Sequence, residues 1–203
     1  MARTCKWGVV RVIGGELHMQ EADAVITPAN NRLSGREGLD AQIHKAAGEE
    51  LREFCKDVSI KQRKLNLPPC PVTTNVVSKP YNLENRFNHI IHVVSPDCRR
   101  PNQDEARRQL LPEAYLNLFA TLKSMKDVNI VMAPPLSMGV FAYPHREGAR
   151  LTLETLLGIM DGDSDPKIKE YNIVVKERNF IGNMRTVYRE SEDQLPGIDT
   201  TMD

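Results

Sequence analysis

The apolar positions of the chain fall into short runs that are separated by polar turns bearing glycine and proline. Runs of this length are too brief for amphipathic helices, and their β-branched residues indicate buried strands. The predicted strands lie at residues 7–13, 24–26, 72–78, 89–94, 129–133 and 171–175.

Longer stretches between these runs carry apolar residues at three- and four-residue steps, the spacing of one helix face. The predicted helices lie at residues 39–54, 104–125, 146–160 and 180–189. Pro112 interrupts the second of them and is a candidate for its first turn. Residues 56–71 are polar and basic and predict a surface connection. Strands that alternate with helices favour an α/β layered sheet over a helix bundle or a β-sandwich.

The connection between the strand at 24–26 and the next helix carries candidate chemistry. Asn30 and Asn31 follow the strand, Gly35 and Gly38 lie in the loop, and Asp40 falls at the start of the helix. Backbone N–H groups at a helix start bind anions, and α/β sheets hold ligands at the carboxyl ends of their strands. The pattern is typical of a phosphate site. The same residues are also ordinary turn formers, and Asp40 could serve only the helix dipole.

A second loop of similar design follows the strand at 129–133 and precedes a helix. It contains Ser137, Gly139 and Phe141. Gly139 lets the backbone approach a ligand closely, so the two loops together could hold a diphosphate through main-chain N–H groups. Phe141 could lie against a sugar, or it could be a core aromatic. The chain contains neither a Walker motif nor GxGxxG, and Ser137 is not in a GxSxG context.

Composition narrows the function further. The chain has 203 residues, which suits one domain, and Lys plus Arg equals Asp plus Glu at 27 each. A net charge of zero gives no electrostatic case for broad binding to nucleic acid or to an acidic membrane. The arginine pairs at 99–100 and 107–108 are the only candidates for contact with single-stranded RNA or poly-ADP-ribose, and such pairs are usually solvated surface.

Cysteine and histidine spacing argues against a metal. The four cysteines, at positions 5, 55, 70 and 98, form no CxxC pair. His89 and His92 are three apart on a predicted strand, so they point to opposite faces and do not easily share an ion. The chain shows no signal peptide and no long apolar run, which predicts a cytoplasmic or nuclear protein with free thiols. A domain cut from a longer polyprotein would look the same.

Three segments, in this order along the chain, resemble a macrodomain, the ADP-ribose-binding module. They are ADAVITPANNRLSGREGLDAQIHKAAG, CPVTTNVVSKPYNLENRFNHIIHVVSP and PPLSMGVFAYP, within roughly residues 8–160. The resemblance implies a three-layer α/β/α fold with a central mixed sheet over residues 1–190. Residues 191–203 form a polar tail that we expect to be mobile.

The resemblance also implies roles for individual residues. Asn30 falls on the position that hydrogen-bonds the distal ribose, and Asp40 on the acid that hydrolytic members use there. Glu16 falls on the adenine-recognising acid position, and the adenine-stacking residue stays unassigned, with Phe180 as the only aromatic nearby. The ligand-binding positions implied are Glu16, Leu17, Ala29, Asn30, Gly38, Leu39, Asp40, Ser137, Met138, Gly139, Val140 and Phe141.

Several positions depart from the family pattern. Thr27 and Pro28 replace an Asn and an Ala, Thr73 stands where Gly is common, and Arg36 and Glu37 interrupt the usual glycine run. The bulky charged side chains of Arg36 and Glu37 argue against catalysis, because hydrolysis depends on close placement of the scissile bond.

The resemblance implies one of two functions. The first is a hydrolase that removes mono-ADP-ribose from acidic side chains of proteins, with Asn30 orienting the ribose and Asp40 positioning water, and with no metal or other cofactor. The second is a reader that binds ADP-ribose or ADP-ribosylated proteins without cleaving them. In either case we expect a monomer whose partners are ADP-ribose and modified proteins, with no membrane partner.

Overall fold

The computed structural model describes the backbone of all residues except 100–103, 177, 191–196 and 200–203. Its side chains are described over the same range, apart from residues 104–108, 178–179 and 198–199. The described strands are β1 (Ala2–Thr4), β2 (Val9–Gly14), β3 (Ala24–Ala29), β4 (Asn75–Ser78), β5 (His89–Val94), β6 (Ile130–Ala133), β7 (Glu170–Val175) and β8 (Ile198–Asp199). The described helices are α1 (Gly38–Ala47), α2 (Glu49–Arg63), α3 (Asp104–Ser124), α4 (His145–Met160) and α5 (Arg178–Glu190).

The strands form one mixed sheet in the order β4-β5-β3-β6-β7-β2-β1-β8. The five strands from β5 to β2 are parallel, and β4, β1 and β8 join the two edges in antiparallel pairing. Parallel strands buried on both faces read as continuous apolar runs, which is the pattern seen in the sequence. The predicted α/β fold with a central mixed sheet is confirmed.

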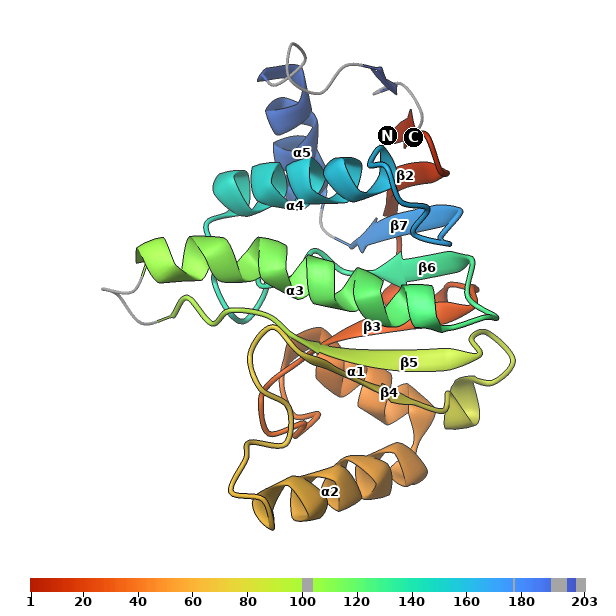
Figure 1. Ribbon diagram of the computed structural model, residues 1–203, viewed down its shortest axis with the longest axis vertical. Coiled ribbons are helices and arrows are strands. Elements are labelled where there is room, and N and C mark those ends of the chain that lie inside the picture. Colours follow the sequence, from red (N-terminus) through yellow and green to blue (C-terminus); the bar gives the residue numbers. More distant parts are fainter. Residues whose placement is uncertain (100–103, 177, 191–196, 200–203) are drawn as a thin grey trace.

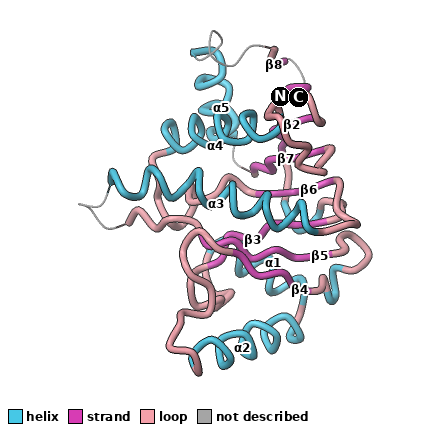
Figure 2. The backbone as a smooth tube through the Cα atoms, in the orientation of Figure 1, coloured by secondary structure: helices cyan, strands magenta, loops and turns pink. Residues whose placement is uncertain are grey.

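Helices cover both faces of the sheet and make three layers. Alternate residues of β3 belong to two separate apolar clusters, with Ile26 on one face and Val25 on the other. The first cluster joins the sheet to α3, α4 and α5, and the second joins it to α1 and α2. Figure 1 shows α3 crossing in front of the sheet with α1 behind it, and Figure 2 shows α3 and α4 lying side by side.

The predicted helix at 39–54 is wrong in its bounds, because it is two helices separated at Gly48. Gly48 has φ of 92°, a left-handed conformation that ends α1 and favours glycine. The chain then continues as α2 to Arg63, so the predicted surface connection from residue 56 is wrong over its first part. Only Leu51 and Cys55 of α2 are buried, which leaves its second half without the apolar pattern of a packed helix.

Three smaller predictions also change. Pro112 lies inside α3 rather than in its first turn. Strand β4 begins only at Asn75, because Thr73 has φ of 70°. That left-handed conformation is the one glycine favours, and here the Thr73 hydroxyl stabilises it by donating to Glu113 Oε1 at 3.0 Å. The predicted mobile tail lies mostly outside the described residues, but Ile198–Asp199 pair with β1.

Candidate functional site

A cleft of about 210 Å³ opens at the carboxyl ends of the parallel strands. It forms because β3 pairs with β6 only at Ala24 and Val25, so the two strands separate before their ends. Beyond that point Pro28 lines the cleft on one side and Pro134 on the other. Proline has no N–H with which to continue a ladder, so these residues keep the gap open. The two candidate loops leave the sheet on either side of it.

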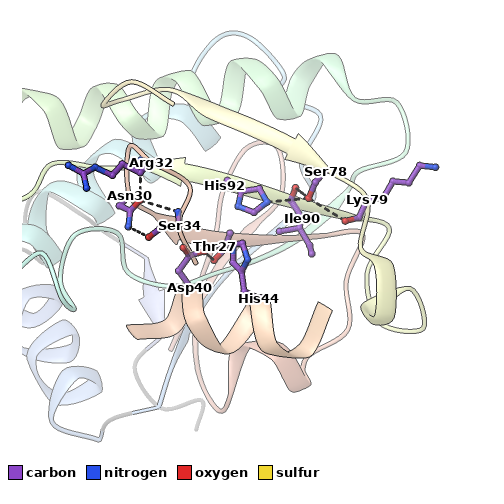
Figure 3. Close-up of polar contacts among 10 residues, drawn as sticks. All are labelled: Thr27, Asn30, Arg32, Ser34, Asp40, His44, Ser78, Lys79, Ile90 and His92. Atoms are coloured by element: carbon purple, nitrogen blue, oxygen red, sulfur yellow. Dashed lines mark hydrogen bonds and ion pairs between the residues drawn. The ribbon is translucent and has the colours of Figure 1, made fainter. Parts of the chain in front are cut away.

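The first loop is held by the side chain of Asn30, which lines the cleft. Its Oδ1 accepts hydrogen bonds from the backbone N–H groups of Arg32 at 3.0 Å and Ser34 at 3.2 Å. Its Nδ2 donates to the Ser34 hydroxyl at 2.7 Å (Figure 3). An amide nitrogen carries two hydrogens, so one N–H of Asn30 is left to donate to a ligand while the loop fixes its direction.

Asp40 lies in the first turn of α1 and lines the same cleft, although only 3% of the residue is exposed. Its Oδ1 accepts a hydrogen bond of 2.6 Å from the Thr27 hydroxyl on β3 (Figure 3). Burial raises the pKa of Asp40 to about 6, although the Thr27 hydroxyl and the backbone N–H of Gly35 donate hydrogen bonds that favour its ionised form. A carboxyl group with this pKa suits proton transfer near neutral pH.

Gly35 packs directly on the imidazole of His44, which lies one turn after Asp40 on α1. A Cβ at Gly35 would lie 2.3 Å from the His44 ring, and its φ of 58° is left-handed. Both properties require glycine at this position. The first loop therefore packs on two buried polar side chains of α1, Asp40 and His44, which form the floor of the loop.

The two loops meet across the cleft. A Cβ at Gly38 would lie 2.7 Å from the Val140 side chain of the second loop. The guanidinium of Arg99 links them at the surface, 3.6 Å from Glu37 and 5.4 Å from the centre of the Phe141 ring. The two candidate loops therefore lie at one cavity, whereas their contact with a diphosphate stays a prediction.

The second loop rests on apolar and aromatic neighbours. Met138 is buried, and its carbonyl accepts a 2.8 Å hydrogen bond from Nε2 of His145, whose ring packs edge-on against Phe180. Gly139 is exposed, and a Cβ there would meet nothing within 4 Å. Ser137 is buried at φ of 65°, and no partner for its hydroxyl is found among the described residues. Phe141 is half-buried at the cleft, so it is not a core aromatic.

Eight of the twelve ligand-binding positions line the cleft. They are Asn30, Leu39, Asp40, Ser137, Met138, Gly139, Val140 and Phe141.

The other four do not line it. Leu17 and Ala29 are core residues, at 2% and 0% exposure. Gly38 is exposed and abuts Val140 instead. Glu16 is exposed, and its carboxylate pairs with Lys176 at 2.9 Å, which lowers the pKa of Glu16. Glu16 therefore contacts Lys176, which lines the cleft, but does not line the cleft itself.

The sequence reasoning assigned no ligand-binding residue to one wall of the cleft, where it named Phe180 only as a nearby aromatic. Val174, Val175 and Lys176 line it from the end of β7, and Phe180 from α5. These residues follow the last apolar strand at the same sheet edge as the two loops, and that shared edge was the available signal. Pro28, Glu37, Pro134, Pro135 and His145 were also not predicted to bind.

The two histidines of β5 have different side-chain partners. The His89 ring lies 2.7 Å from Asp127 at the surface, whereas Nε2 of the buried His92 faces the Ser78 hydroxyl at 3.2 Å. Of the candidate arginines for nucleic-acid contact, Arg99 is engaged by Asp97 and Glu37. The side chains of Arg100, Arg107 and Arg108 lie outside the described residues.

The fold and the cleft define a three-layer α/β ligand-binding module in which two glycine-containing loops converge at the ends of adjacent parallel strands. Residues 26–152 match the family model described as Macro domain. The chain belongs to the macro domain family. Of the helices that the structure describes, none is long and apolar enough to cross a membrane.

Relatives of known sequence and structure agree with this assignment. The chain is 28% identical to a protein of Cronobacter sakazakii named O-acetyl-ADP-ribose deacetylase, over 94% of this chain and 98% of that one. It is 31% identical to a macro domain-containing protein of Caldanaerobacter subterraneus, over 92% and 97%. The Oceanobacillus iheyensis macrodomain with ADP superposes with a TM-score of 0.81 at 23% identity, over 96% and 97% of the chains, which shows the shared fold.

Proposed function

We propose that this chain binds ADP-ribose in the cleft and hydrolyses the ester bond that joins its distal ribose to an acidic side chain of a protein. The observation that carries this proposal is the convergence of the two loops on one cavity, where a Cβ at Gly38 would touch Val140. A relative that matches 94% of this chain is named O-acetyl-ADP-ribose deacetylase, and that name supports the same class of reaction, ester hydrolysis.

The diphosphate would be held by peptide N–H groups of the two loops. Gly139 supports this placement, because it is exposed at the cleft with open space above it. Among the described residues that line the cleft, Lys176 is the one lysine or arginine, and Glu16 already pairs with it. Recognition of phosphate through backbone dipoles fits a site with so few basic side chains.

Asn30 would orient the distal ribose with its remaining N–H. Three hydrogen bonds to Arg32 and Ser34 hold its amide in place, so little rotational freedom is lost when a ribose hydroxyl accepts from it. A fixed donor of this kind favours the reacting geometry over other orientations of the sugar.

Asp40 would activate the attacking water. With a pKa of about 6, its carboxyl is mostly ionised at neutral pH and can accept a proton from water. Addition of water across the ester gives ADP-ribose and the free carboxylate of the protein side chain. The same chemistry on O-acetyl-ADP-ribose gives ADP-ribose and acetate, so both esters are candidate substrates of one site.

A reader function is the second candidate, and the composition of the first loop favours it. Glu37 lines the cleft with a side chain that is 54% exposed, where a glycine run would leave space for the bond to be cleaved. Asp40 is almost fully covered, which limits its approach to water. A cleft with these properties can hold ADP-ribose without cleaving an ester.

Incubation with an automodified ADP-ribosyltransferase that carries labelled mono-ADP-ribose on acidic residues separates the two functions. The hydrolase proposal predicts release of labelled ADP-ribose with multiple turnovers, and loss of release in Asn30→Ala. Ser34→Ala is the matched control, because it removes a partner of Asn30 and keeps the amide. Label that persists at stoichiometric protein, together with ADP-ribose binding by calorimetry, would establish the reader. If the protein neither releases the label nor binds ADP-ribose, both proposed functions are wrong.

A further inference from the structure

Three side chains with metal-binding atoms meet beneath the first loop, on the face of the sheet that α1 and α2 cover. They are His44 of α1, Cys55 of α2 and His92 of β5. One ligand atom of each lies within 4.8 Å of the other two. All three residues are buried, at 1%, 3% and 0% exposure.

The hydrogen bonds of Ser78 determine which nitrogen of His92 can bind a metal. The Ser78 hydroxyl has one hydrogen and lies 3.2 Å from the carbonyl oxygen of Lys79, 3.5 Å from that of Ile90 and 3.2 Å from Nε2 of His92 (Figure 3). When the hydroxyl donates to a carbonyl, its oxygen accepts a hydrogen bond from Nε2–H of His92. The lone pair of His92 is then on Nδ1, a buried atom for which no hydrogen-bond partner is found among the described residues. A metal-binding histidine typically donates its other N–H to a fixed acceptor in this way.

Both ring nitrogens of His44 are also without a hydrogen-bond partner within the part of the chain that the structure describes. Oδ1 of Asp40 lies 3.7 Å from Nε2 of His44. Burial lowers the pKa of both imidazoles, which favours their neutral forms. Unpartnered polar atoms in an apolar interior are unfavourable, and buried native groups rarely lack a partner. Two neutral imidazoles with free lone pairs beside a thiol are a donor set for a transition metal.

We propose that His44, Cys55 and His92 bind one zinc ion, which links α1, α2 and β5 beneath the first loop. Zinc accepts nitrogen and sulfur ligands without a strong geometric preference of its own. Its ligands in tetrahedral coordination lie roughly 3.3–3.7 Å apart, so the three side chains would have to close by at most about 1.5 Å on binding. Binding replaces the S–H proton of Cys55 by the metal and releases that proton to solvent. The neighbouring Asp40 carboxylate compensates part of the remaining positive charge.

The role of this ion would be structural, because it would support the floor on which Gly35 and the first loop rest. A Cβ at Gly35 would touch the His44 ring, so the position of that ring determines the position of the loop. The sequence contains no CxxC pair, and its one HxxH spacing, at residues 89–92, supplies only His92 to this site, because each ligand comes from a different element. This proposal does not depend on the proposed function.

Cobalt(II) in place of zinc tests the site through absorption spectroscopy. The purified chain is titrated with Co²⁺ both in its native state and during refolding from denaturant, since the site is buried. We expect one Co²⁺ per chain, with a near-ultraviolet thiolate-to-cobalt band that Zn²⁺ abolishes. Zinc at a hundredfold excess over its dissociation constant should raise Tm by about 5–10 °C.

Cysteine variants assign the ligand. Cys55→Ser should lose the band, whereas Cys5→Ser and Cys70→Ser should keep it. Cys70 is the demanding control, because it is buried and its Sγ already contacts the Thr74 hydroxyl at 3.3 Å. Should Cys55→Ser fail to fold, a triple variant at positions 5, 70 and 98 leaves Cys55 as the only thiol and should retain the band.

Three results would overturn the proposal. The first is absence of the thiolate band in both native and refolded wild-type protein. The second is a band that survives in Cys55→Ser or disappears in the triple variant. The third is stabilisation by zinc without any thiolate band, which would place the ion elsewhere.

Discussion

The two loops of the cleft differ in what lies beneath them. The first loop rests on polar groups, with Asn30 bonded within the loop and Asp40 and His44 under it. The second loop rests on the buried side chains of Leu136 and Met138, and a Cβ added at its exposed Gly139 would meet nothing within 4 Å. Two loops with similar sequence patterns therefore differ in the side chains beneath them, which are polar under the first loop and apolar under the second.

Because of this difference, we expect the first loop to serve the chemical reaction and the second loop only to bind the ligand. Polar groups with fixed partners can orient a sugar and move a proton, whereas a loop on an apolar base offers only backbone N–H groups and a surface for packing. Substitutions of the first-loop residues that make these polar or packed contacts, Gly35 and Asn30, should therefore change folding or turnover. Substitutions in the second should change affinity alone.

The largest effect is expected for Gly35→Ala. A left-handed conformation costs a residue with a Cβ roughly 1–2 kcal/mol, and overpacking against the His44 ring adds about 1–3 kcal/mol. Thermal unfolding should show Tm lower by about 4–8 °C or more. The matched variant Gly139→Ala has open space for its Cβ and should leave Tm within about 2 °C of wild type. Equal losses in the two variants would remove the proposed difference between the loops.

Asn30→Ala should reduce release of ADP-ribose from the modified transferase about 100-fold, because the fixed donor to the distal ribose is lost. Affinity for free ADP-ribose should fall by less than about tenfold, since one hydrogen bond is removed from a larger contact. Single-turnover kinetics and calorimetry measure the two quantities separately. Unchanged turnover would mean that the distal ribose lies elsewhere.

Gly139→Val should weaken ADP-ribose binding about tenfold without affecting folding, because its side chain would occupy the space where the second loop approaches phosphate. Calorimetry measures the affinity, and the Tm of the variant controls for folding. Normal affinity would refute the placement of phosphate at this loop.

The smallest effect is expected for Glu37→Gln. Its ion pair with Arg99 is exposed, so stability should change by less than about 0.5 kcal/mol. Removal of a negative charge beside a bound diphosphate should raise affinity about two- to threefold at low salt, and the gain should disappear at high salt. A gain that is independent of salt would argue against a phosphate near Glu37.

The two loops and the alternation of strands with helices along the chain could be predicted from local sequence. Strand, polar turn, glycine and helix follow one another within each unit, so Asn30, Asp40 and Gly139 were placed at the cleft without coordinates. The break at Gly48 was missed because its signal is a single glycine inside a helical period. The second half of α2 was missed because it is polar and mostly exposed.

The remaining parts of the site depend on pairing between distant segments. Lys176 and Phe180 reach the cleft only because β7 lies beside β6 in the sheet. Glu16 was placed at the ligand from the resemblance, yet its carboxylate pairs with Lys176 at the rim. The meeting of His44, Cys55 and His92 has the same origin, since each comes from a different element.

A calorimetric comparison of ADP-ribose with AMP tests most directly whether both loops hold one diphosphate. We predict a single site for ADP-ribose per chain and an affinity for AMP at least about tenfold weaker, because AMP lacks the second phosphate and the distal ribose. Equal affinity for the two ligands, or no binding of ADP-ribose, would contradict the account.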